Sequence, residues 1–117
     1  MAAVTTLLVL TNLPDQASAD ALATALVDAR LAACVNILPP CRSVYRWQGA
    51  LENATEVPLL IKTDSARYSA LETAIRAQHP YQLPEVIALT VTQGLPAYLA
   101  WVADETRPAR QPTDSPP

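Results

Sequence analysis

The segment "HPYQLPE", residues 79–85, concentrates side chains that could do chemistry. It holds the only histidine of the chain, His79, together with Tyr81 and Glu85. Its two prolines each restrict the preceding residue to extended backbone. We therefore predict a rigid, extended connector from which His79, Tyr81 and Glu85 point roughly to one side. Such a connector would fix the directions of these polar groups before any ligand binds.

A purely structural interpretation of His79 stays open. A histidine at the end of a helix can interact with the helix dipole, and a proline just beyond a helix is common. At 3.3 Å per extended residue, His79 and Glu85 would lie about 20 Å apart, too far to bind one ion together. A metal site must therefore recruit ligands from elsewhere in the fold or from another subunit. Cys34 is the candidate, since a thiolate with an imidazole suits copper or zinc, and its alternative is a small buried hydrophobic residue.

Other candidate groups also allow two interpretations. The single lysine, Lys62, either forms a salt bridge to Glu56 or Glu85 or binds an anion in a cleft. Trp47 either fills the core or a subunit interface or stacks on a ligand, and the same choice applies to Trp101.

Composition narrows the classes of function. With 117 residues, half of them hydrophobic, and a net charge of −3, the chain is expected to fold as one domain. It has neither an apolar run long enough to cross a membrane nor a basic signal-peptide start, so we expect no membrane association and a cytoplasmic location. Its eight basic residues are scattered, which argues against nucleic acid as a partner. We find no activated nucleophile and no cofactor motif, so an enzyme is not expected.

The elements that position these groups follow from hydrophobic periodicity and turn residues. Strands are predicted over 5–13, 34–38, 43–48, 56–63 and 86–91, and helices after Asp15 or Ser18, after Asp64 or Ser65, and near Pro96. This order is typical of an α+β, ferredoxin-like βαββαβ antiparallel sheet with both helices on one face and an added C-terminal helix. Residues 1–106 would form the single domain, and the proline-rich residues 107–117 a disordered tail.

Several local expectations accompany this scheme. Leu22, Leu26 and Ala29 should share the buried face of the first helix. Pro58 should mark a sheet edge or the beginning of regular pairing. The open face of the sheet should be covered by the 43–63 hairpin, by the last helix or by a second copy of the chain.

Five stretches in this order and spacing resemble one known family. They are "ARLAACVNILP", "SVYRWQG", "EVPLLIKT", "HPYQLPEVIAL" and "YLAWV". Together they are similar to the CutA divalent-cation tolerance proteins, over about residues 4–105.

The resemblance implies properties beyond those read from the residues. It implies a tight homotrimer and tolerance of divalent metal ions, copper above all, with a role in metal binding. The family's signature residues correspond to Cys34, Trp47, Lys62, His79, Tyr81 and Glu85. These would gather in a cleft between subunits, with His79 and Cys34 as metal ligands and the other four as cleft residues. The architecture also resembles the PII signalling trimers, so a scaffold that binds a small anionic ligand through Lys62 is the alternative.

Overall fold

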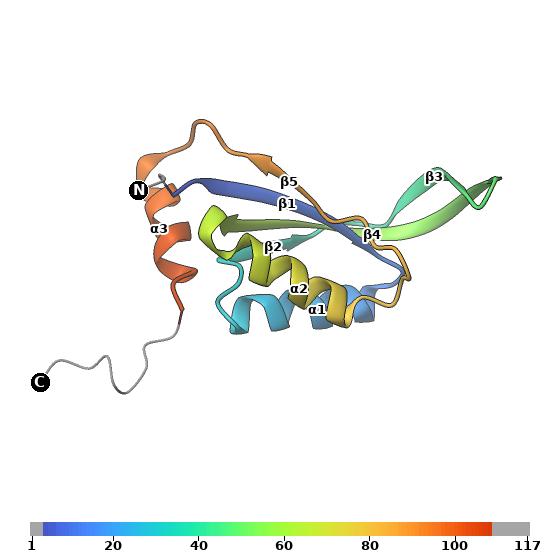
Figure 1. Cartoon of the computed structure of the whole chain (residues 1–117), viewed down its shortest axis with the longest axis horizontal. Helices are drawn as coiled ribbons and strands as arrows, with labels where there is room; N and C mark the ends of the chain where they lie inside the picture. Colours follow the sequence, from blue (N-terminus) through green and yellow to red (C-terminus); the bar gives the residue numbers. More distant parts are fainter. Residues whose placement is uncertain (1–3, 109–117) are drawn as a thin grey trace, which may run out of the picture.

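The predicted order of elements is present in a computed structural model, which describes residues 4–108 (Figure 1). The elements are β1 (Thr6–Leu13), α1 (Gln16–Asp28), β2 (Cys34–Ile37), β3 (Cys41–Trp47), β4 (Ala50–Asp64), a 3-10 turn (Ser65–Arg67), α2 (Tyr68–Gln78), β5 (Ile87–Thr90) and α3 (Pro96–Glu105). The main difference from the sequence prediction is β4, which begins directly after the turn at Gly49 and is 15 residues long.

The sheet has the order β2-β4-β1-β5, and all its pairings are antiparallel. This is the split βαβ arrangement, with α1 and α2 both below the sheet in Figure 1. Pro58 lies in the central strand β4, opposite Asn12 of β1, so its assignment to a sheet edge is wrong. Pro58 instead stands where pairing with β3 stops and pairing with β2 starts, which agrees with the second expectation for it.

The core lies between the sheet and the two helices because the strands alternate. On β4 the buried apolar residues are Val57, Leu59 and Ile61, while Pro58 and Leu60 between them are partly exposed on the other side. Leu71 and Ile75 of α2 are fully buried against this face, as their spacing predicts. We call the opposite side, which carries no helix layer, the open face.

Helix α1 begins as predicted and ends at Asp28, one residue before Ala29. The carboxylate of Asp15 caps it by accepting the Ser18 N–H at 2.7 Å. Leu22 and Leu26 are buried, but Ala29 is exposed and forms the C-cap, so its assignment to the buried face is wrong. The chain reverses there because Arg30 adopts a left-handed φ of 58° and the next amide, of Leu31, bonds back to the Leu26 carbonyl at 3.0 Å.

Arg30→Gly is expected to stabilise the protein by about 0.5–1 kcal/mol. A residue with a β-carbon is disfavoured at positive φ, whereas glycine adopts it without a steric penalty. The prediction is checked by urea unfolding of the variant at the wild-type protein concentration, with Asp28→Gly, inside the last turn of α1, as a control that should lose stability. An Arg30→Gly protein less stable than wild type would contradict it.

Strands β3 and β4 form a hairpin that extends away from the domain (Figure 1). Gln48 and Gly49 form its two-residue turn, with φ of 49° and 83°, the conformation that matches the twist of paired strands. The register places Tyr45 and Trp47 on one side of β3, as predicted, because they pair with Glu52 and Ala50. Since the hairpin projects outward, it does not cover the open face of its own chain, although this was one of the three alternatives expected (Figure 1).

The open face therefore keeps exposed apolar side chains. Ile87 and Leu89 of β5 are 51% and 54% exposed, and they pair with Leu10 and Leu8 of β1. The apolar run over 86–91 is typical of a buried strand, which is wrong for the single chain, because among residues 4–108 no helix layer covers the open face of β5. Helix α3 covers only one end of the open face, where Tyr98 reaches Cys34.

The predicted tail lies mostly outside the described residues. Its first residue, Arg107, forms an ion pair with Asp104 at 2.8 Å on the surface of α3. The disorder predicted for the remainder concerns residues 109–117, which the structure does not describe.

Candidate functional site

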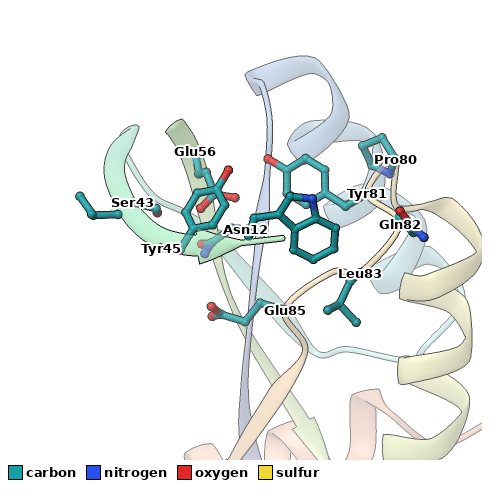
Figure 2. A pocket seen from close by; sticks show the side chains of 11 residues that line it. Asn12, Ser43, Tyr45, Glu56, Pro80, Tyr81, Gln82, Leu83 and Glu85 are labelled. Atoms are coloured by element: carbon teal, nitrogen blue, oxygen red, sulfur yellow. The ribbon is translucent and has the colours of Figure 1, made fainter. Parts of the chain in front are cut away.

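A cavity of about 750 Å³ lies where the hairpin leaves the domain. Its walls come from the hairpin, from the end of β1 and from the connector between α2 and β5, as Figure 2 shows. The lining residues are Asn12, Ser43, Val44, Tyr45, Trp47, Glu56, Pro80, Tyr81, Gln82, Leu83 and Glu85. We call it the hairpin pocket. It contains two carboxylates and three large aromatic rings, and no lysine or arginine among residues 4–108 lines it.

His79 lies behind the wall of this pocket as a buried, fully hydrogen-bonded residue. It is 8% exposed. Its Nε2 lies 2.6 Å from the carbonyl oxygen of Asn12, to which it donates, and its Nδ1 accepts the Tyr81 N–H at 3.1 Å. These contacts require the neutral imidazole with its proton on Nε2. His79 thus ties the connector to β1 and sets the direction of Tyr81.

The connector is not the extended rod that the two prolines predict. His79 itself is extended, with φ −80° and ψ 133°, as expected before a proline. Residues 80–83 then bend, because the Tyr81 amide turns back onto the His79 ring. The rings of His79 and Tyr81 pack 4.7 Å apart at 50°. The expectation that His79, Tyr81 and Glu85 all point to one side is therefore wrong, since His79 points into the domain.

Tyr81 and Glu56 form the polar floor of the pocket. The hydroxyl of Tyr81 points towards the carboxylate of Glu56 in Figure 2, and Glu56 is 8% exposed. Burial, followed by the hydrogen bond with Glu56 and its negative charge, raises the pKa of Tyr81 to about 12. Nothing in the sequence singles out Glu56 as a pocket residue, because β4 places it there only through its pairing with the hairpin strand β3.

The contact between Tyr81 and Glu56 should make the stability of the fold depend on pH in the alkaline range. The folded state raises the pKa of Tyr81 from 10.0 to about 12. The neutral Tyr81 phenol therefore stabilises the folded state fully below pH 10, and this stabilisation is lost as the pH rises towards 12. Glu56→Gln removes the neighbouring charge and should lower the pKa of Tyr81. The measurement is the ultraviolet absorbance of phenolate during alkaline titration. Tyr68→Phe, at a tyrosine whose pKa is raised by burial and Glu72, is the control and should leave the Tyr81 transition unchanged.

Cys34 and Lys62 form a second polar cluster on the open face. They pair directly across β2 and β4, and the Lys62 ammonium lies 4.0 Å from the Cys34 sulfur. The phenol of Tyr98 also contacts Cys34, and burial with this contact raises the pKa of Tyr98. Within residues 4–108 the one ion pair joins Arg107 and Asp104, so the salt bridge predicted between Lys62 and a glutamate is wrong.

The structure thus divides the six predicted site residues into two groups within one chain. Trp47, Tyr81 and Glu85 line the hairpin pocket, with His79 directly behind it. Cys34 and Lys62 lie together near α3, and Lys62 is about 20 Å along β4 from Glu56 at the rise of a strand. The alternation of β4 puts Lys62 and the pocket residue Glu56 on the open face, whereas His79 points into the domain.

No set of three metal-ligating side chains is found in the part of the chain that the structure describes. His79 and Cys34 do not meet within one subunit, so a metal site that uses both needs a second copy. In the same residues, no helix combines the length and the apolar character needed to cross a membrane.

Comparisons with known proteins agree with this fold. The family model "CutA1 divalent ion tolerance protein" matches residues 7–105. A protein CutA homolog of Xenopus laevis is 50% identical over 91 residues, which are 78% of this chain and 60% of that protein. The chain therefore spans less than two thirds of that relative.

Solved structures give the same result. CutA from Xylella fastidiosa superposes with a TM-score of 0.86 at 46% identity, covering 88% of this chain and 99% of that one. A protein of Archaeoglobus fulgidus named a periplasmic divalent cation tolerance protein has a TM-score of 0.84 at 30% identity, covering 87% and 99%. With the family model matched across nearly the whole described chain, this protein belongs to the CutA1 divalent ion tolerance family.

Proposed function

We propose that the chain works as a homotrimeric binding protein for divalent metal ions, copper foremost, and not as an enzyme. The observation that carries this proposal is the open face. It exposes apolar side chains, among them Ile87 and Leu89, beside the two polar groups named above. A face of this kind is typical of a subunit interface, and the polar groups would then line an inter-subunit cleft.

The proposed metal ligands are Cys34 and His79 from neighbouring copies. Cys34 is partly exposed, and its thiol is free. A thiolate prefers soft ions, which favours copper among the divalent cations. His79 can take part only where Nδ1 exchanges the Tyr81 N–H for the ion, since both its ring nitrogens are in use. Trp47, Lys62, Tyr81 and Glu85 would form the rest of the cleft.

Anaerobic calorimetry with copper tests the ligand assignment. Cys34→Ser should weaken binding at least about tenfold, which corresponds to ~1.4 kcal/mol. Cys41→Ser is the matched control, because Cys41 is the other free cysteine and lies exposed at the start of β3. Equal affinities in wild type and Cys34→Ser would remove Cys34 from the site, and equal affinities in wild type and His79→Gln would remove His79.

A second function is favoured by the position of Lys62. Its ammonium lies beside Cys34 and has no carboxylate partner among residues 4–108, so it is free to bind an anion in the cleft. A PII-like trimer that binds a small anionic ligand would use this group. A thermal-shift screen of anions on wild type and Lys62→Met tests it, and an unchanged response in the variant would contradict it.

We propose the cytoplasm as the location, on the basis of the two free cysteines. Cell fractionation checks it, and recovery of the protein from the periplasm, the compartment in the name of the Archaeoglobus fulgidus relative, would contradict it.

A further inference from the structure

The hairpin pocket has a chemistry that differs from that of the Cys34 cluster. Its lining includes Glu56 and Glu85 and no basic residue. Glu56 is more than nine-tenths buried, and no cation of residues 4–108 pairs with it. A buried carboxylate without a positive partner is unfavourable, so the pocket is suited to a ligand that brings positive charge.

The walls of the pocket favour an organic cation over a hydrated metal ion. Tyr45, Trp47 and Tyr81 supply three aromatic rings, and Val44 and Leu83 add apolar surface. Aromatic faces attract ammonium groups and also pack against the methylene groups attached to them. Hard divalent ions instead prefer several oxygen ligands, and the described residues contain no acidic set of that kind.

The two carboxylates are separated. In Figure 2 the carboxylate of Glu56 lies near the Tyr81 hydroxyl, whereas Glu85 lies in another part of the pocket. Two negative groups held apart by aromatic surface match a molecule with a positive charge at each end and an apolar middle. The volume of about 750 Å³ is within the usual range for small-molecule sites.

We propose that the hairpin pocket binds linear aliphatic diamines, with one ammonium at Glu56, the alkyl chain along Tyr45, Trp47 and Tyr81, and the second ammonium at Glu85. A primary ammonium fits Glu56 better than a quaternary one, because its N–H groups can donate to the buried carboxylate. The hairpin pocket shares Trp47, Tyr81 and Glu85 with the proposed metal cleft, but Cys34 does not line it.

Calorimetry at neutral pH in an amine-free buffer tests the proposal on the full chain. The probes are 1,4-diaminobutane, its homologues with three to eight carbons, butylamine and 1-butanol. Binding should require a positive charge, so that 1-butanol does not bind, and diamines should bind more tightly than butylamine. Affinity should peak at one chain length, because the carboxylates are fixed. A steady rise with chain length, as apolar burial alone would give, would overturn the proposal.

Substitutions of the two glutamates test which of them binds each ammonium group of the diamine. Glu56→Gln should weaken diamine binding by about tenfold to a hundredfold, the range for a hydrogen bond to a charged group. Glu85 is exposed, so Glu85→Gln should fold normally and abolish the preference for diamines over butylamine. Glu105→Gln on α3 removes the same charge away from the pocket and should change nothing. Equal binding by Glu85→Gln and wild type would refute the assignment, even if Glu56→Gln failed to fold.

The variant Cys34→Ser separates the diamine proposal from the proposal that the protein binds metal ions. Cys34→Ser should bind diamines as wild type does, because Cys34 does not line the hairpin pocket. Loss of diamine binding in Cys34→Ser would show that the amines bind at the cysteine cluster instead and would overturn the assignment to the hairpin pocket.

Discussion

Leu89→Lys is expected to convert the proposed trimer into single subunits. Leu89 lies on the open face of the edge strand β5 and is 54% exposed in one chain. Lysine is well tolerated on an exposed edge strand, so the subunit itself should fold normally. In an interface the same ammonium would be buried without a partner, which should weaken association by about a hundredfold or more. Sedimentation at micromolar concentration should give a mass near 12.6 kDa instead of three times that value.

Val27→Lys is the matched control for this prediction. Val27 is also an exposed apolar residue, 42% accessible, but it lies on α1 in the helix layer. It gains the same charge near a helix C-terminus, where a lysine is favourable. The control should remain assembled. A wild-type protein that sediments as a stable monomer would contradict the trimer, and a Leu89→Lys protein that stays assembled would exclude this face from the interface.

His79→Ala is expected to lower the free energy of unfolding by about 2–4 kcal/mol even with a chelator present. The substitution removes a buried ring and leaves the Asn12 carbonyl and the Tyr81 amide without partners. It should also release Tyr81 and so weaken diamine binding in the hairpin pocket. The measurement is urea unfolding at matched protein concentration, because the stability of a protein that assembles depends on its concentration.

Two conservative variants separate the roles of the ring nitrogens. His79→Gln can keep the donor to Asn12, and His79→Asn can accept the Tyr81 amide in an Asx turn. Each should recover part of the loss. A loss below about 1 kcal/mol in His79→Ala would show that the two hydrogen bonds contribute little. Since His79→Ala also removes these two hydrogen bonds, a loss of copper affinity in that variant does not identify His79 as a ligand. His79→Gln can keep the hydrogen bond to Asn12, so it is the better variant for the copper experiment.

The sequence alone determined the order of elements and most of their boundaries. The cap at Asp15 and the burial of Leu22 and Leu26 on the first helix are present as predicted. These features depend on contacts between near neighbours in the chain, which local periodicity and capping residues specify. The family could be recognised for the same reason, because the residue types and spacing within each of the five short stretches are features of the local sequence.

Only the tertiary structure decided which side chains meet. His79 looked like a ligand because it stands in a proline-braced segment, but its ring nitrogens are used by Asn12, 67 residues away, and by Tyr81. Glu56 looked like the partner of Lys62, yet it faces Tyr81. The apolar run in β5 resembled a buried strand although its open side has no cover within the chain. Long-range pairing places these groups, and a hydrophobic pattern is the same whether a helix of this chain or a second copy buries it.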